Sequence, residues 1–312
     1  MSPTEDDITA WFRAQRALPA DRFPIGIGDD MAQIAVGQGA SVLITTDMLL
    51  EGTHFDLRTA TLQQAGYKAM ATSLSDCAAM ATVPLAAVVA VGLPPDFGDA
   101  RLKELHAGIV QAGDRYDCPL VGGDITCWKS ARGLAVSVAM LSKPGDCDPV
   151  RRDGARAGDV ICVTGSLGGS GQGRHLDFTP RVEEALAIAR AVRLHAMIDI
   201  SDGLSTDLNR ICRQSGVGAV LNASFIPVSP AAQERRDPLA AALNEGEDFE
   251  LLFALPAGQW EKLRRSWNAS VPITEIGNVT AEPRMQIVMP DGACRELKPG
   301  GYDHLGDASR PA

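Results

Sequence analysis

The sequence predicts a mixed α/β (α+β) protein built from two domains. Its 312 residues are more than one typical hydrophobic core organises and are enough for two domains of ordinary size. Aromatic residues make up only 5% of the chain while alanine and glycine are plentiful, which favours layered α/β structure over an aromatic-rich β-sandwich. Strand-like and helix-like runs alternate along both halves. We expect one domain over residues 1–145 and the other over residues 146–312.

The first half contains strand-like and helix-like segments in alternation. Residues 41–46 (SVLITT), 85–93 and 134–141 are rich in β-branched and apolar side chains, as strands are. Residues 61–81 carry apolar or small side chains at helical spacing, which predicts a helix with one apolar face. A second helix is predicted over residues 99–116.

A linker rich in turn-forming residues is predicted over residues 142–149 (SKPGDCDP), after which the pattern restarts. The second half begins with a strand at residues 159–164 and a Gly-rich loop at residues 165–173 (GSLGGSGQG). Backbone N–H groups of such a loop can bind an anion, although a flexible hairpin or lid fits the composition at least as well. The remaining predicted elements are helices at 181–193, 205–215 and 257–267 and strands at 197–200, 249–255 and 285–289.

Charge, apolar runs and cysteines limit the classes of partner. The net charge is -10 and no block of Lys or Arg appears, which argues against a nucleic-acid binder. The longest apolar run, residues 85–93, is too short to cross a bilayer, and the first twenty residues lack the apolar segment of a signal peptide. Seven cysteines are scattered without C-x-x-C spacing, as in reduced cytosolic proteins. We expect a cytoplasmic protein with neither nucleic acid nor membrane as partner.

Several common nucleotide and hydrolase motifs are missing from the sequence. It has no G-x-x-x-x-G-K-[ST], no G-x-G-x-x-G and no H-R-D or D-F-G set, which argues against a P-loop enzyme, a Rossmann dinucleotide binder and a protein kinase. No G-x-S-x-G motif appears either. Any nucleotide chemistry must therefore rest on other residues.

Aspartates recur beside glycines or at the ends of predicted strands. Taken singly, each has an ordinary structural explanation as a turn or a helix N-cap. Taken together, they predict that several carboxylates converge. Without a cation such carboxylates would repel one another, and a bound Mg²⁺ would remove that repulsion. The segments are Gly28-Asp29-Asp30, Thr45-Thr46-Asp47, Ser75-Asp76, Gly122-Gly123-Asp124 and Asp199-Ile200-Ser201-Asp202-Gly203.

Asp76 fits the structural explanation least well. Its position in the predicted 61–81 helix places it on or beside the apolar face. A carboxylate there is costly unless a positive group meets it, and either an arginine or a metal ion would serve. Asp47 follows a predicted strand, where α/β proteins commonly place ligand chemistry.

In this order, the motifs resemble those of thiamine-monophosphate kinases, and they span nearly the whole chain. The matching segments are residues 26–30 (GIGDD), 45–55 (TTDMLLEGTHF), 67–80 (YKAMATSLSDCAAM), 121–126 (VGGDIT), 152–159 (RDGARAGD), 198–204 (IDISDGL), 246–253 (GEDFELLF) and 301–304 (GYDH). The resemblance implies a two-domain ATP-binding fold like that of aminoimidazole ribonucleotide synthetase, with an N-terminal ATP-binding domain and a C-terminal α/β domain. It also implies a homodimer formed through the N-terminal domain.

The resemblance further implies ATP-dependent conversion of thiamine monophosphate to thiamine diphosphate, with several Mg²⁺ ions. The implied metal ligands are Asp30, Thr45, Thr46, Asp47, Asp76, Asp124, Asp199 and Asp202. The implied nucleotide contacts are Gly123, Asp124, Arg152 and Ser201. Asp202 and Arg152 are the implied catalytic residues, and His54, Glu247 and Tyr302 the implied contacts to thiamine monophosphate.

A phosphate acceptor fits the residues, because a phosphate monoester is already anionic at neutral pH and needs no general base. No convincing His–Asp or Ser–His pair appears in the sequence. Segment 173–180 is short for the family, which implies a different loop on the acceptor side.

Two alternatives remain open. One is another ATP-using enzyme of the same superfamily, although selenophosphate synthetase would need a reactive cysteine earlier than Cys77 and the hydrogenase-maturation dehydratase a cysteine at the C-terminus. The other is a nucleotide-binding paralogue without catalytic activity.

Overall fold

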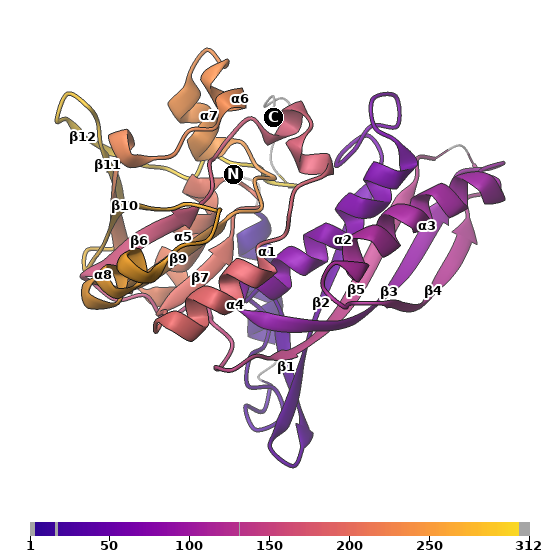
Figure 1. Cartoon of the computed structure of the whole chain (residues 1–312), viewed down its shortest axis with the longest axis horizontal. Coiled ribbons are helices and arrows are strands. Elements are labelled where there is room, and N and C mark those ends of the chain that lie inside the picture. The colour runs from indigo at the N-terminus through magenta and orange to yellow at the C-terminus, as the bar shows by residue number, and fades with distance from the viewer. Residues whose placement is uncertain (1–3, 16–17, 131, 306–312) are drawn as a thin grey trace.

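The computed structural model describes residues 4–15, 18–130 and 132–305. Two β-sheets, one in each half of the chain, flank a long central helix (Figure 1). The family-level expectation of a mixed α/β protein is thereby confirmed. The C-terminal cysteine that the hydrogenase-maturation dehydratase would need falls among the last residues of the chain, and these lie outside the described ranges.

The first sheet contains five strands in the order β1-β2-β5-β3-β4. All neighbours are antiparallel except β3 and β4, which run parallel. Two helices, α2 and α3, lie on one face of this sheet (Figure 1). The bounds are β1 Ala32–Gly37, β2 Ala40–Leu50, α2 Leu62–Ala79, β3 Thr82–Leu93, α3 Asp99–Asp114, β4 Leu120–Cys127 and β5 Ala135–Pro144.

Helix α2 connects the two halves of the molecule. It begins with a capping box in which the Thr61 hydroxyl accepts from the Gln64 backbone N–H and the Gln64 side chain accepts from the Thr61 N–H. Beyond the cap, the helix contacts α3, the first sheet, α4 (Val182–Ala191) and β7 (Ala196–Asp199). Because partners surround it, α2 buries polar residues as well as apolar ones, among them Lys68, Ser73 and Ser75.

The second sheet contains seven strands in the order β12-β11-β8-β10-β6-β9-β7. Only the β8–β11 pair is parallel. Its strands are β6 Asp159–Thr164, β7, β8 Gly218–Asn222, β9 Leu251–Pro256, β10 Ile273–Thr280, β11 Met285–Val288 and β12 Cys294–Glu296. Its helices are α4, α5 Leu204–Ser215, α6 Pro230–Gln233, α7 Pro238–Asn244 and α8 Ala257–Ser266, with short 3₁₀ turns η1 Ser170–Gln172, η2 Arg174–Leu176 and η3 Ala223–Phe225.

The predicted segments with clear periodicity are confirmed within a few residues. The structure corrects the linker, because β5 continues to Pro144, which pairs with Thr82 in β3. An N-terminal helix, α1 (Glu5–Gln15), was not expected, nor were the strands β1, β4, β8, β10 and β12. Within the part of the chain that the structure describes, no helix is both long and apolar enough to cross a membrane.

Candidate functional site

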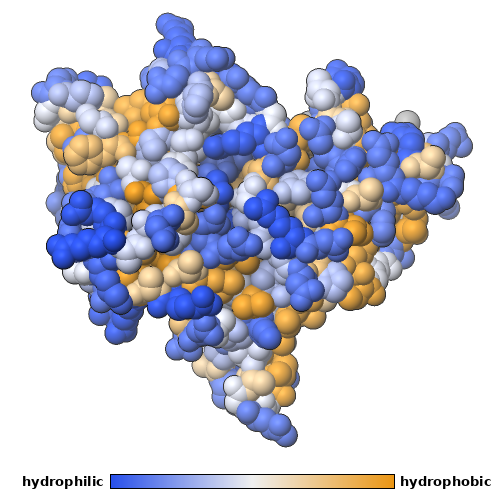
Figure 2. Space-filling model, viewed as in Figure 1, coloured by the Kyte–Doolittle hydropathy of each residue, from blue (hydrophilic) through white to orange (hydrophobic). Residues whose placement is uncertain are grey.

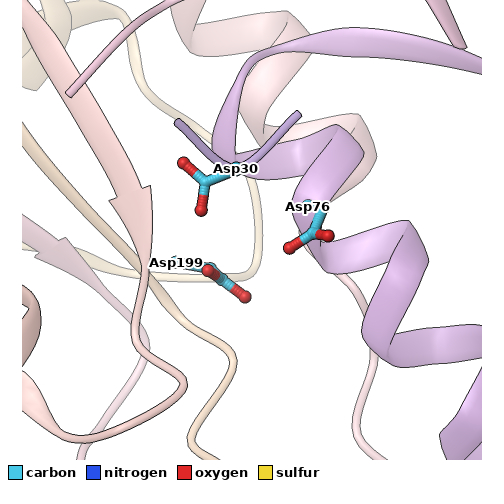
Figure 3. Close-up of side chains that lie close together, drawn as sticks. All are labelled: Asp30, Asp76 and Asp199. Carbon is cyan, nitrogen blue, oxygen red and sulfur yellow. The ribbon is translucent and has the colours of Figure 1, made fainter. Parts of the chain in front are cut away.

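Three aspartates from distant parts of the sequence meet between the two sheets. Asp30 precedes β1, Asp76 lies on α2, and Asp199 ends β7. One carboxylate oxygen of each lies within 4.8 Å of those of the other two, and the three side chains point into a common space (Figure 3). The sequence prediction that these carboxylates converge is therefore confirmed for Asp30, Asp76 and Asp199.

Hydroxyl groups hold three of the neighbouring carboxylates in place. Ser75 on α2 donates to Asp199 over 2.6 Å, and Thr45 on β2 donates to Asp76. Ser73, also on α2, donates over 2.5 Å to Asp47 on β2. Each hydroxyl donates to one oxygen of its carboxylate. The second oxygen of that carboxylate receives no bond from these hydroxyls.

The aspartates at this site hold their protons more tightly than ordinary aspartates. Partial burial, together with the nearby charges of Asp47, Asp199 and Asp30, raises the pKa of Asp76 well above its usual value. Burial and the charge of Asp30 likewise raise the pKa of Asp199. Burial raises the pKa of Asp47 to about 6, although its bond from Ser73 opposes this. A cation among these groups would relieve both repulsion and desolvation.

Arg152 is the side-chain cation bonded to this group within the described residues. Its guanidinium makes two bonds to Asp30, of 2.9 and 2.5 Å, in the planar geometry that suits a carboxylate. The backbone N–H of Arg152 also donates to Asp29 over 3.1 Å. In this structure, therefore, Arg152 contacts the aspartate cluster directly.

The donor set suits Mg²⁺. The hard carboxylate oxygens come from Asp47 on β2, Asp76 on α2, Asp199 on β7 and Asp30 in the segment before β1, and Mg²⁺ prefers such ligands. Among the described residues, Arg152 is bonded to Asp30 alone of these four carboxylates, so the other three, when deprotonated, carry negative charge without a bonded cation.

Two predicted metal ligands lie on the other face of the first sheet. Side chains alternate along β2, so Thr46 points away from the face that carries Thr45 and Asp47. Asp124 pairs with the exposed Ala90 and points to the same outer face as Thr46. Neither belongs to the three-aspartate cluster of its own chain.

Gly123 lies on β4 next to Asp124. A Cβ at this position would stand 2.0 Å from the carbonyl oxygen of Val89, so the close approach of β4 to β3 already requires glycine here.

Asp202 and Ser201 lie in the loop after β7, beside a cavity of about 490 Å³. Asp202 accepts from Arg210 over 2.6 Å, and Arg210 also bonds to the buried Asp207 and to Asp6 on α1. The cavity borders Arg152, Ser201, Asp202 and the arginines of α5.

The three predicted contacts to thiamine monophosphate lie around this same loop. Tyr302 donates its backbone N–H to the carbonyl of Asp202, and Glu247 donates its own to the carbonyl of Ser201 over 2.7 Å. The Tyr302 ring packs edge-on against His304, with centroids 4.7 Å apart, and His304 lies 5.3 Å from the ring of His54. The structure thus brings His54, Glu247 and Tyr302 into one region.

Two residues at this end of the site were missed by the sequence analysis. Lys68 on α2 is fully buried and contacts the carbonyl of His54, the carboxylate of Glu247 and the ring of His175. A signal for Lys68 was present, because it lies three residues after Ala65 on the apolar face of the predicted helix. Nothing in the sequence singled out His175.

The Gly-rich loop binds carboxylates of the protein itself. The N–H of Gly168 donates to Asp248 and that of Gly169 donates to Glu245, both over 2.7 Å. Arg174 completes the arrangement by pairing with Asp248. The loop is therefore held in place by residues 245–248, rather than being the flexible lid that its composition allowed.

Comparison with known proteins places this architecture in a family. The N-terminal domain of AIR synthase related protein matches residues 28–143, and the C-terminal domain of the same family matches residues 156–290. The solved structure of hydrogenase maturation protein HypE in complex with ATP matches with a TM-score of 0.69, covering 87% of this chain and 88% of HypE, at 18% identity. At that identity the likeness shows a shared fold alone.

Closer similarity is found to thiamine-monophosphate kinases. The thiamine-monophosphate kinase of Rhodopirellula baltica is 34% identical over 313 residues, which cover 96% of this chain and 97% of the relative. The solved structure of AaThiL complexed with AMPPCP and TMP matches with a TM-score of 0.82 and 29% identity, covering 96% of this chain and 97% of that one. The chain belongs to the thiamine-monophosphate kinase family.

Proposed function

We propose that this protein transfers the terminal phosphoryl group of ATP directly to the phosphate of thiamine monophosphate, giving thiamine diphosphate and ADP. The observation that carries the proposal is the convergence of Asp30, Asp76 and Asp199 beside the loop that holds Glu247 and Tyr302. It is supported by full-length similarity to a thiamine-monophosphate kinase and by the structural match to a relative bound to an ATP analogue and TMP.

The acceptor is a phosphate monoester with a second pKa of about 6, so no residue must remove a proton from it. What the protein must do is bring two phosphates together and reduce their repulsion. Arg152 and the loop with Ser201 and Asp202 border the cavity beside the aspartates, and we assign them to the phosphates of ATP. His54, Glu247 and Tyr302 we assign to the acceptor.

We assign Asp30, Asp47, Asp76 and Asp199, with the Thr45 hydroxyl, to hold Mg²⁺. Magnesium bound there would neutralise phosphate charge during the transfer. The hydroxyls of Ser73 and Ser75 orient Asp47 and Asp199 from the rigid helix α2.

The outer face of the first sheet supports a homodimer. Helices α2 and α3 lie on the opposite face, and apolar atoms gather along the lower right edge of the molecule in Figure 2. The exposed apolar side chains on strands of this face are Ile44, Met48, Leu50, Val88 and Leu141. We propose that a second copy of the chain covers this face.

Such a dimer would give Asp124 and Thr46 a role. Both point to the outer face, so in the dimer they would face the partner's first sheet. We propose that Asp124 binds metal or nucleotide at this interface rather than in the three-aspartate cluster. We also assign dimerisation and most of the metal ligands to residues 1–145, with the second half completing the metal and nucleotide site through Arg152, Asp199, Ser201 and Asp202. We place the enzyme in the cytoplasm, which agrees with its seven free cysteines.

The test is a screen of phosphate acceptors with Mg-ATP, including thiamine, thiamine monophosphate and aminoimidazole ribonucleotide precursors. We expect thiamine diphosphate from thiamine monophosphate and little product from thiamine. Turnover of thiamine without turnover of its monophosphate would reject the proposal. Binding of ATP without turnover of any acceptor would indicate a non-catalytic nucleotide-binding protein.

A further inference from the structure

A buried ammonium group lies at the acceptor end of helix α2. Lys68 is fully buried, and its Nζ contacts the backbone carbonyl of His54, Glu247 Oε1 at 2.5 Å and His175 Nδ1 at 2.7 Å. The same nitrogen of His175 lies 3.0 Å from Glu247 Oε2. One ammonium group thus connects a helix of the first half with a loop of that half and two segments of the second half.

Burial makes this arrangement expensive unless each member is paired. Burial lowers the pKa of Lys68, and the charge of Glu247 opposes that shift. Burial acts to raise the pKa of Glu247, yet the bonds from His175 and Lys68 outweigh it and leave the pKa below its usual value. Loss of Glu247 would leave the fully buried Lys68 ammonium group without its carboxylate partner.

Glu247 is also held in an unfavourable backbone conformation. Its φ of 64° lies in the left-handed region, which residues other than glycine adopt only when the surroundings enforce it. Its backbone N–H donates to the carbonyl of Ser201, so the conformation connects Glu247 to the loop beside the aspartate cluster. The side-chain bond to Lys68 is a second restraint on the same residue.

A second ion pair runs beside the first. Arg174 and His175 are adjacent in η2, and they contact the adjacent carboxylates Asp248 and Glu247. This double contact fixes η2 against the segment that carries Glu247. Lys68 then ties both segments to α2.

Helix α2 also carries the metal end of the site. Lys68 and Asp76 are eight residues apart on it, which corresponds to about 12 Å along a helix. The helix is rigid, so whatever Lys68 orients is held at a fixed distance from Asp76.

We propose that Lys68, with His175, is a positioning residue that fixes the carboxylate of Glu247 and the loop of His54 to receive the organic part of the acceptor. The inference rests on the proposed function, because the acceptor is the molecule that Glu247 and His54 are assigned to contact. Lys68 acts through Glu247 and His54 and takes no part in the chemistry at the metal end.

The test replaces Lys68 by methionine, which has a similar unbranched side chain but no charge. Lys103→Met is the matched control, because Lys103 is an exposed lysine on α3 paired with Asp99. For Lys68→Met we expect a rise of about tenfold or more in KM for thiamine monophosphate, the effect of losing one charged hydrogen bond. KM for ATP and kcat at saturating acceptor should stay near wild type, as should every parameter of Lys103→Met.

A general loss of structure would also weaken acceptor binding, so a second variant separates the two causes. Leu263→Ala truncates a fully buried side chain of α8, away from the Lys68 cluster, and should lower the melting temperature while KM for thiamine monophosphate stays near wild type. If Lys68 positions Glu247, Lys68→Met raises this KM and Leu263→Ala does not. An equal rise in both destabilised variants would reduce Lys68 to a structural role and overturn the inference.

His175→Gln provides a milder change, since it leaves the ion pair of Lys68 with Glu247 in place. We expect a smaller rise in KM for thiamine monophosphate with KM for ATP unchanged. Equal rises for both substrates in the Lys68 and His175 variants would also overturn the inference. Failure of the wild-type protein to use thiamine monophosphate would instead reject the proposed function, so the two failures are distinguishable.

Discussion

Helix α2 carries two clusters of charged side chains, one around Lys68 and one around Asp76, and they differ in how their charges are balanced. At the Lys68 end, the ammonium group is paired with the Glu247 carboxylate, and the His175 ring lies against both. At the Asp76 end, the side-chain donors that the described residues offer to the carboxylates of Asp76, Asp47 and Asp199 are hydroxyl groups. The Lys68 cluster contains both charges of an ion pair and needs no bound ion to balance them. The carboxylates of the Asp76 cluster repel one another when they are deprotonated.

This difference separates a positioning cluster from a ligand-binding one. A self-neutralised cluster stabilises the folded state and keeps its members in place. A cluster of like charges is costly in the folded state and persists where a cation is bound during function. The same helix can therefore carry a rigid acceptor platform and a metal site.

The largest expected effect comes from Asp76→Asn. Removing this ligand charge should lower kcat by about 10²-fold or more, since the charge of the transferred phosphoryl group is then less well neutralised. The melting temperature without metal should stay the same or rise, because one repelling carboxylate is gone. Turnover at saturating Mg-ATP and metal-free melting are the measurements. Normal turnover with early melting would assign Asp76 to the scaffold.

Asp47→Asn should resemble Asp76→Asn, and the double variant tests whether they act together. If both serve one metal cluster, the loss of kcat in the double variant is much less than the product of the single losses. Losses that multiply would show that Asp47 and Asp76 act independently.

A third prediction concerns the outer face of the first sheet, which neither cluster occupies. Met48→Asp places a charge in the middle of the apolar face and should convert a dimer to a monomer, as measured by light scattering. Phe225→Asp is the control, because Phe225 is as exposed an apolar residue but lies on η3 in the second half. A fully active wild-type monomer at micromolar concentration would contradict the dimer.

The sequence predicts the segments whose signals are local. The 61–81 helix and the strands at 85–93 and 159–164 follow from periodicity alone, and the structure has α2, β3 and β6 there. Strand β4 was missed because its two glycines and mostly exposed side chains give no strand pattern in the sequence. It forms a strand because it pairs with β3 in the folded protein.

The residues of the site also fall into those that the sequence revealed and those that it did not. The aspartates were visible as repeated motifs, and the alternation along β2 could have separated Thr46 from Thr45 and Asp47. The partnership of Lys68 with Glu247 could not be foreseen, because it joins residues that are distant in the sequence and meet only when the two halves pack together.

The smallest predicted effect is a pH-dependent response of stability to Mg²⁺. The pKa of Asp47 is raised to about 6, and those of Asp76 and Asp199 are raised as well. The folded state then binds more protons than the unfolded state above pH 4, so metal-free stability falls as pH rises through these values.

Magnesium should therefore raise the melting temperature by a few degrees, more at pH 8 than at pH 5. Thermal melts with and without Mg²⁺ at both pH values provide the measurement. An equal shift at both pH values, or the same shift in Asp76→Asn, would place the bound metal elsewhere.

The division of labour along α2 is tested most directly by titrating thiamine monophosphate at saturating Mg-ATP with Asp76→Asn and Lys68→Met side by side. We predict that Asp76→Asn loses kcat with KM for the acceptor nearly unchanged, and that Lys68→Met raises this KM with kcat nearly unchanged. If both variants lose kcat and acceptor affinity in the same proportion, the two ends of the helix do not have separate tasks and the account is wrong.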